Sequence, residues 1–154
     1  MQTGANRITI ADGNTINSSQ IRLIAKSFMG TEEDLYDLCM RFNASYVVID
    51  FWGELTDRLY GEYHVFGISY RGRIIPVGKW TAIATIALGE DFKPEEYLTS
   101  DDQGRVFPSD KAMNVTIFKL VLSAFEYSEL ELFKPIYLSP NRQVLIFKVL
   151  RQQE

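Results

Sequence analysis

The sequence predicts an α/β fold: a single domain with a small mixed β-sheet, helices packed around it and a C-terminal hairpin. The length of 154 residues matches one domain. The N-terminal third alternates between strand-like and helix-like spacing of apolar residues, which is typical of layered α/β domains. Two strand-like runs near the C-terminus flank Ser139-Pro140-Asn141-Arg142, a turn-forming segment that predicts the hairpin.

The chain begins with a predicted strand and a predicted helix. Residues 7–11 alternate in polarity as a short strand does, and a glycine-containing turn follows them. Ser18 or Ser19 can cap a helix that runs to Met29 with apolar residues at helical spacing. Gly30 is then expected to end this helix.

A second helix and a second strand follow. The hydroxyl of Thr31 can accept from the amide near Asp34, and the acidic residues of this turn complement the helix dipole. Residues 46–51 are almost all β-branched or aromatic, which predicts a central strand covered on both faces. The order strand, helix, helix, strand favours parallel pairing of these early strands. The buried face of the second helix is predicted at Leu35, Leu38, Cys39 and Phe42.

The rest of the chain predicts further helical segments and the hairpin. Residues 52–73 fit no single pattern, because helical and extended spacing both occur there. The segment 100–108 predicts a loop. Ser109 is expected to cap the most hydrophobic helix of the chain, which should run unbroken to Phe125. The other predicted elements are a short helix at 79–88, a single turn that begins at Pro94, and hairpin strands at 135–139 and 143–150.

Charge and reactive residues exclude several classes of function. Lys and Arg number 16 against 20 Asp and Glu, a formal charge of −4, so we expect no nucleic-acid partner. One cysteine, Cys39, and one histidine, His64, exclude internal disulfides, thiolate clusters and multi-histidine zinc sites. The start has no signal-peptide core and enters a strand pattern at once, so we expect a soluble piece of a longer protein.

Asp110, Met113 and Ile117 carry the functional argument. In one continuous helix with about 100° between residues, these three fall on the same face. In the simpler interpretation Asp110 caps the helix while Met113 and Ile117 fill the core. The alternative is that this face binds a ligand.

The segment 4–21, GANRITIADGNTINSSQI, is followed by a predicted helix pair and then by ASYVVID at 44–50. This succession resembles the catalytic subunits of N-oligosaccharyltransferases, in the part that directly follows the Trp-Trp-Asp-Tyr-Gly motif of their C-terminal globular domain. The resemblance runs over most of the chain and is strongest at 4–50 and 110–120. The Trp-Trp-Asp-Tyr-Gly motif itself does not occur in the 154 residues.

The resemblance implies a membrane oligosaccharyltransferase, most like the archaeal type, that transfers a lipid-linked oligosaccharide to the Asn of Asn-X-Ser/Thr sequons. Residues 1–154 would be its soluble domain on the extracellular side of the cell membrane, where it helps recognise Ser/Thr at position +2 of the acceptor peptide. The implied divalent metal, Mn or Mg, and the lipid-linked donor would be bound by the membrane part. The chain alone is therefore expected to be inactive.

In this family a helical motif of the form Asp-x-x-Lys-x-x-x-Met/Ile helps hold the Ser/Thr residue. The motif maps onto Asp110, Met113 and Ile117, and the resemblance implies that these three bind the acceptor, with Ile117 against the Thr methyl. Met113 stands where the motif has lysine, which removes any role for an ammonium group there. Burial of one methyl would favour Thr over Ser by about 1 kcal/mol.

Two alternatives remain open on the sequence. One is a non-enzymatic α/β binding or interaction module, in which the helix of the motif is plain core. The other is an accessory domain of a glycosyltransferase with a sugar pocket around Trp52 or Trp80. The chain also holds sequons at Asn17, Asn43 and Asn114, of which Asn114 is expected inside a helix and Asn17 is the expected acceptor.

Overall fold

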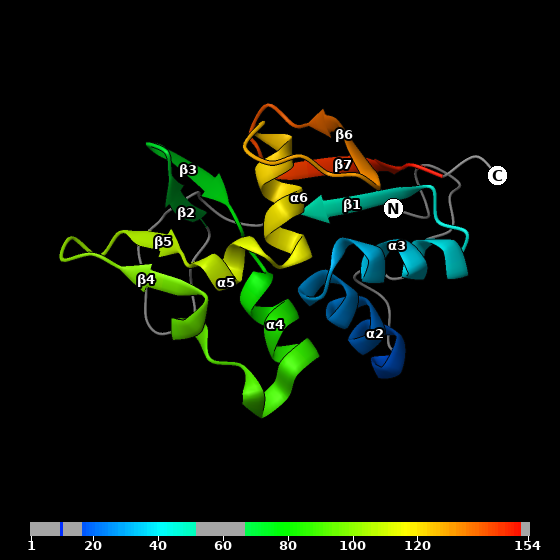
Figure 1. Ribbon diagram of the computed structural model, residues 1–154, viewed down its shortest axis with the longest axis horizontal. Helices are drawn as coiled ribbons and strands as arrows, with labels where there is room; N and C mark the ends of the chain where they lie inside the picture. Colours follow the sequence, from blue (N-terminus) through cyan, green and yellow to red (C-terminus); the bar gives the residue numbers. More distant parts are fainter. Residues whose placement is uncertain (1–9, 11–16, 52–66, 152–154) are drawn as a thin grey trace.

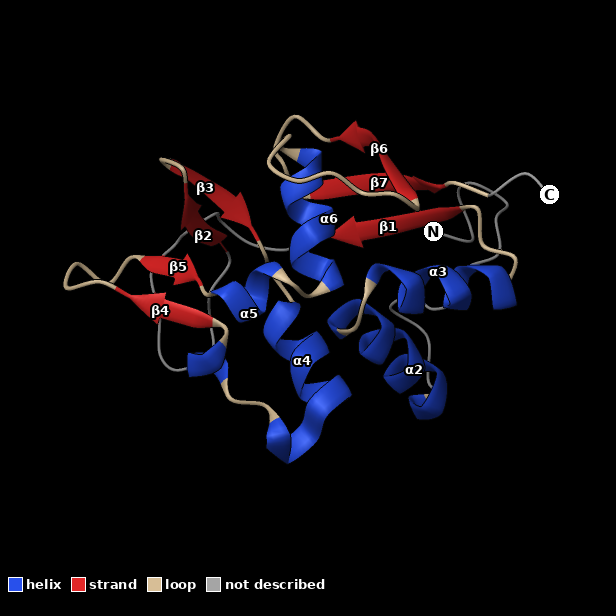
Figure 2. Cartoon of the chain, in the orientation of Figure 1, coloured by secondary structure: helices blue, strands red, loops and turns tan. Residues whose placement is uncertain are grey.

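The computed structural model describes residues 10, 17–51 and 67–151, and everything below concerns this part of the chain. The predicted α/β class is confirmed (Figures 1 and 2). The helical elements are α2 (Ser18–Met29), α3 (Glu32–Arg41), α4 (Trp80–Leu88), η1 (Gly89–Asp91), η2 (Pro94–Glu96), α5 (Asp110–Met113) and α6 (Thr116–Ala124). The strands are β1 (Tyr46–Asp50), β2 (Gly67–Tyr70), β3 (Arg73–Pro76), β4 (Leu98–Ser100), β5 (Val106–Pro108), β6 (Phe133–Leu138) and β7 (Val144–Val149).

The largest described sheet has the order β1-β7-β6, and both of its pairings are antiparallel. The predicted hairpin is confirmed as β6 and β7. The prediction of a central strand at 46–51 is wrong for the described strands, because β7 lies in the middle and β1 beside it. β1 also buries one face only: Val47 and Ile49 are buried, whereas Tyr46 is 54% exposed. The predicted strand at 7–11, on which the expected parallel pairing depends, lies outside the described residues except for Ile10.

The α2–α3 pair forms as the sequence predicts, with one change of cap. Asn17, rather than a serine, caps α2, and its Oδ1 accepts from the Gln20 amide at 3.1 Å. The α3 cap is reciprocal, because Thr31 Oγ1 accepts from the Asp34 amide at 3.3 Å while Asp34 Oδ2 accepts from the Thr31 amide at 2.8 Å. Phe42 was expected to be buried and is 38% exposed, because it follows the last turn of α3.

Two short hairpins occur where the sequence predicts either a loop or no clear element. β2 and β3 meet through Arg71 and Gly72, which both have positive φ, as a tight hairpin turn with right-handed strand twist requires. β4 and β5 pair across 98–108, so the predicted loop at 100–108 is confirmed only for the turn at 101–105, and both ends of the range are strands. The turn between them is held by Asp101, whose Oδ1 accepts from the amides of Gln103 and Arg105.

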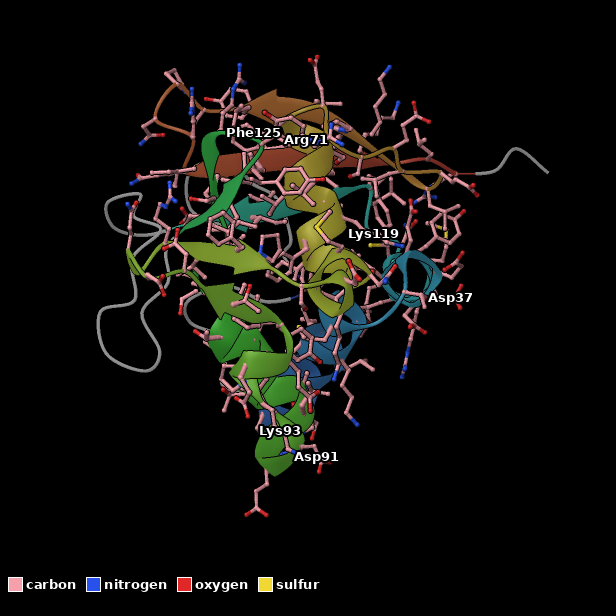
Figure 3. The ribbon with its side chains drawn as sticks, turned by 60° about the vertical axis from the view of Figure 1, so that its left-hand side comes forward. Asp37, Arg71, Asp91, Lys93, Lys119 and Phe125 are labelled. Atoms are coloured by element: carbon pink, nitrogen blue, oxygen red, sulfur yellow. The ribbon has the colours of Figure 1, made fainter. Side chains whose placement is uncertain are left out.

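The core lies between the sheet and the helices. α6 crosses the inner face of the β1-β7-β6 sheet, and every residue from Thr116 to Ser123 except Lys119 is buried. α4 packs beside α2, and its Trp80 is completely buried with its ring edge-on to Phe92 and Phe118. Figure 3 shows the molecule from the sheet end near Phe125 to the opposite tip at Asp91 and Lys93.

Candidate functional site

The predicted helix at 109–125 is two helices. α5 ends at Met113, and Val115 has extended backbone angles (φ −86°, ψ 145°) before α6 begins at Thr116. The break is fixed by Gly30, whose carbonyl accepts from the Thr116 amide at 3.1 Å and from the Thr116 hydroxyl at 2.8 Å. Asn114 therefore lies at the junction of two helices. The prediction that it lies inside one helix is wrong.

This break separates the three predicted site residues. Asp110 is exposed on the first turn of α5, and Met113 lies one turn later, partly buried and packed against the core. Ile117 comes after the break and is 1% exposed, within the core itself. The structure thus places Asp110 and Met113 together on a short surface helix, with Ile117 in the core against which Met113 packs.

α5 is held against η2 by a group of polar contacts. The Ser109 hydroxyl accepts from the Ala112 amide at 3.2 Å and donates to the Glu96 carbonyl at 2.6 Å. Lys111 forms a hydrogen-bonded ion pair with Glu96, and its ammonium lies 4.8 Å from the centre of the Tyr97 ring. These contacts fix the position of α5 although it has only four residues.

Lys111, Glu96 and Tyr97 were not found from the sequence, because 15 residues separate the ion-paired side chains and no motif joins them. The hydrogen bond from Lys111 and its positive charge lower the pKa of the Glu96 carboxyl, and the same hydrogen bond raises the pKa of Lys111. The Lys111 side chain thus points from α5 toward η2, where it pairs with Glu96.

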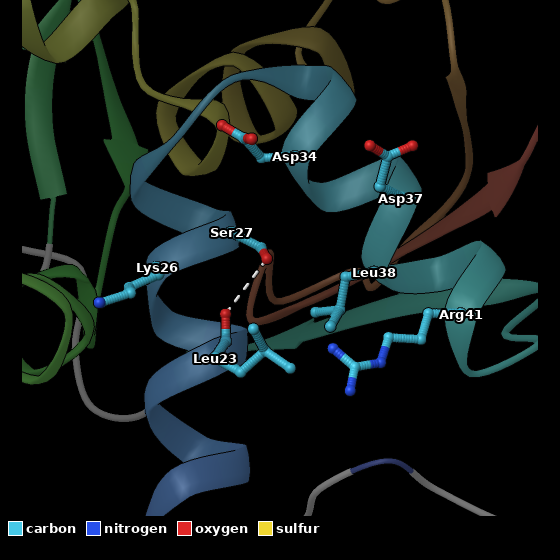
Figure 4. Close-up of a pocket in the computed structure, with 7 residues that line it drawn as sticks. All are labelled: Leu23, Lys26, Ser27, Asp34, Asp37, Leu38 and Arg41. Carbon is cyan, nitrogen blue, oxygen red and sulfur yellow. Dashed lines mark hydrogen bonds between the residues drawn. The ribbon is translucent and has the colours of Figure 1, made fainter.

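A separate open pocket of about 370 Å³ lies between α2 and α3 (Figure 4). Its polar lining is mixed in charge, with Lys26 and Arg41 against Asp34 and Asp37. Asp34 is already engaged in the cap of α3, and none of the predicted site residues lines this pocket. The arrangement selects no particular charge of ligand.

The remaining candidate residues are placed as follows. Trp80 is completely buried against Phe92 and Phe118, so it cannot form the face of a sugar pocket. Trp52 and His64 lie outside the described residues. Cys39 is buried in α3, where loss of hydration raises the pKa of its thiol to about 11.

The described residues contain no group of three or more His, Cys, Asp or Glu side chains that could hold a metal ion. These residues offer no ligand set for the divalent metal that the resemblance implies, which the resemblance places in the membrane part. Among the described helices, none combines the length and the apolar composition that a membrane span needs.

Comparison with known proteins supports the resemblance seen in the sequence. No protein-family model matches the chain. A stretch of 99 residues, 62% of the chain, is 30% identical to the dolichyl-diphosphooligosaccharide--protein glycosyltransferase subunit stt-3 of Caenorhabditis elegans. The chain covers only 11% of the length of that relative.

The solved structures include one with the same fold. The C-terminal globular domain of an oligosaccharyltransferase from Archaeoglobus fulgidus superposes with a TM-score of 0.55, over 97% of this chain and 73% of that one, at 19% identity. The chain therefore has the fold of an oligosaccharyltransferase C-terminal globular domain and is similar in sequence to a glycosyltransferase subunit of the same class.

Proposed function

We propose that the chain is the C-terminal domain of an oligosaccharyltransferase that transfers a lipid-linked oligosaccharide to the Asn of Asn-X-Ser/Thr sequons. The observation that carries the proposal is the agreement of two comparisons, since the sequence match and the fold match name the same class of enzyme. The enzyme would be of the archaeal type, with this domain on the extracellular side of the membrane. Its divalent metal and its lipid-linked donor would be bound outside this chain.

Within this proposal, the acceptor site is the exposed face of α5. The carboxylate of Asp110 is exposed and makes no ion pair with any described residue, so it is available to accept a hydrogen bond from the Ser/Thr hydroxyl at position +2. Met113 is partly buried, and its flexible thioether can contact the methyl group of Thr. Ile117 acts from below as a positioning residue, because its side chain is in the core.

The domain would contribute affinity and position to catalysis. Holding the +2 residue fixes the sequon relative to the reacting centre in the membrane part, and such positioning lowers the entropic part of the barrier. The rigid contacts of α5 with η2 suit this task, because a binding group must be held in one place for orientation to help. The chain by itself would bind acceptor weakly and would transfer nothing.

The test uses the intact oligosaccharyltransferase and synthetic Asn-X-Thr and Asn-X-Ser peptides. We expect Asp110→Asn to raise the KM of both peptides with little change in kcat. Met113→Ala should lower the preference for Thr over Ser by about fivefold, the equivalent of about 1 kcal/mol.

Matched controls exist within the chain. Asp91→Asn alters an exposed carboxylate at the far tip of the molecule, and Met40→Ala shortens a partly buried methionine of α3. Both controls should leave the peptide kinetics unchanged. Unaltered KM values and an unaltered Thr preference in folded Asp110→Asn and Met113→Ala enzymes would refute the site.

A further inference from the structure

The sequon Asn43-Ala44-Ser45 forms the connection between α3 and β1. Asn43 has a φ of 51° and directly follows the C-terminal residues of α3. Its amide donates to the Met40 carbonyl at 3.1 Å and the Ala44 amide donates to the Cys39 carbonyl at 2.8 Å, the pattern of a helix that ends in a left-handed residue. Asparagine tolerates the left-handed conformation better than most residues. In this turn Asn43 is exposed to solvent.

The reactive groups of this sequon are accessible. Oδ1 of Asn43 accepts from Nη2 of Arg151 at 2.5 Å, whereas no described residue accepts from its Nδ2. Ser45 is exposed, and it is the Ser45 carbonyl, not the hydroxyl, that accepts from the Val149 amide. Asn43 and Ser45, which carry the amide nitrogen and the +2 hydroxyl of the sequon, are thus both exposed residues in the described part of the chain.

The sequon at Asn114 is closed by its own hydrogen bonds. Nδ2 of Asn114 donates to the Asp110 carbonyl at 2.9 Å. The hydroxyl of Thr116 is completely buried and donates to the Gly30 carbonyl. Both groups that an acceptor must present are occupied, so Asn114 serves as a reference site inside the same chain.

The sequon at Asn17 leads into a helix. Asn17 caps α2 through its Oδ1, and Ser18 and Ser19 belong to the first turn of that helix. Of the three sequons in the described residues, the one at Asn43 has exposed Asn and Ser residues and lies in neither a helix nor a strand.

We propose that Asn43 is an N-glycosylation site of this protein. The inference rests on the proposed function, because it needs the domain to face the compartment in which sequons are modified. The co-reactant is an oligosaccharide joined to a lipid carrier through phosphate. Nδ2 of Asn43 bonds to the anomeric carbon, the bond from that carbon to the phosphate oxygen breaks, the carrier phosphate keeps the electron pair, and Nδ2 loses one proton.

The geometry tolerates the product. The new bond forms at Nδ2, so Oδ1 stays available to Arg151, and the hydrogen bond between them can survive the modification. The turn is at the surface, so the glycan extends into solvent and no described core side chain has to move.

The experiment analyses the intact oligosaccharyltransferase purified from its own cells. Protease digestion and mass spectrometry should show a glycan on the peptide with Asn43 and none on the peptide with Asn114. Ser45→Ala should abolish the glycan at Asn43 without altering the fold, because the Ser45 side chain is exposed. Ser45→Thr should retain it.

Transfer to a synthetic sequon peptide, measured on the same preparation, separates this inference from the proposed function. Transfer to the peptide with an unmodified Asn43 would refute the glycosylation site and leave the function in place. A glycan on Asn43 in a preparation that transfers nothing to the peptide would support the site and count against the function. Equal glycan occupancy at Asn43 and Asn114 would overturn the structural argument.

Discussion

Thr116 is a polar residue with no exposed surface, and its hydroxyl donates to the Gly30 carbonyl. Thr116→Val keeps the shape of the side chain and removes this hydrogen bond. We expect the free energy of unfolding to fall by about 1 kcal/mol, the typical net value of a buried hydrogen bond. Urea unfolding measures the loss. Thr116→Ser, which keeps the hydroxyl, should lose only the contribution of the methyl group, and equal stability of the Val variant and the wild type would contradict the argument.

Gly30 explains why this carbonyl is available. A Cβ atom at position 30 would overlap the carboxylate of Asp34, which is fixed by the reciprocal cap of α3. The absence of a side chain lets the turn between α2 and α3 stay tight and present its carbonyl to Thr116. The sequence showed Gly30 as the end of a helix, but it could not show this second role, since the partner is 86 residues away.

At the scale of elements, the sequence predicted several helix ends that depend on interactions between neighbouring residues. The cap of α3 and the end of α2 were predicted because Thr31, Asp34 and Gly30 act on neighbouring residues. The break between α5 and α6 was missed because a contact with Gly30 imposes it on a run of good helix formers. The pairing of β4 with β5 was missed for another reason: its turn is held locally by Asp101, but the polar residues of this turn predict only a loop.

The Glu96–Lys111 pair joins η2 to α5, so its effect should depend on pH. The pKa of Glu96 is lower in the folded chain than its ordinary value of 4.5. The pair therefore stabilises the fold above that value, and the stabilisation is lost as the pH falls through the lowered pKa. Wild type should exceed Glu96→Gln in urea midpoint at pH 7, and the difference should shrink as the pH falls below 4.5.

Salt and a neighbouring carboxylate serve as controls for this pair. High salt should shrink the difference at pH 7, because both side chains are exposed to solvent. Glu95→Gln removes an adjacent exposed carboxylate and should not reproduce the pH dependence. A difference between wild type and Glu96→Gln that stays constant as the pH falls from 7 to well below 4.5 would show that the ion pair does not hold α5 in place.

At the scale of the whole molecule, the sequence predicted the fold class and the resemblance to oligosaccharyltransferases, and the fold match and the sequence match support both. The α/β class follows from periodicity, which burial of one face imposes along the chain. The grouping of Asp110, Met113 and Ile117 assumed one straight helix, whereas the structure has two helices here and Ile117 is buried in the core. The contribution of Lys111 and Glu96 could not be predicted, because it arises only once distant segments are packed together.

Cys39 reports on the unfolding of the whole molecule, because it is the one cysteine and it is buried. With a thiol pKa of about 11, the folded chain should resist iodoacetamide at pH 8. Labelling in increasing urea should follow the unfolding curve measured by tryptophan fluorescence. Labelling in buffer at the rate of a free thiol would mean that α3 opens independently of the rest.

The hydrogen bonds between Thr116 and the Gly30 carbonyl can form only after both distant segments of the chain have been synthesised. These partners are 86 residues apart, and the Leu132 amide that donates to Glu32 is 100 residues from its acceptor. β1 likewise pairs with β7, near the other end of the chain. During synthesis the apolar faces of α2, α3 and β1 therefore stay uncovered until α6 and β7 have been made and can pack against them. Contacts so distant in sequence predict slow folding, and they make the unfinished chain a natural client for chaperones.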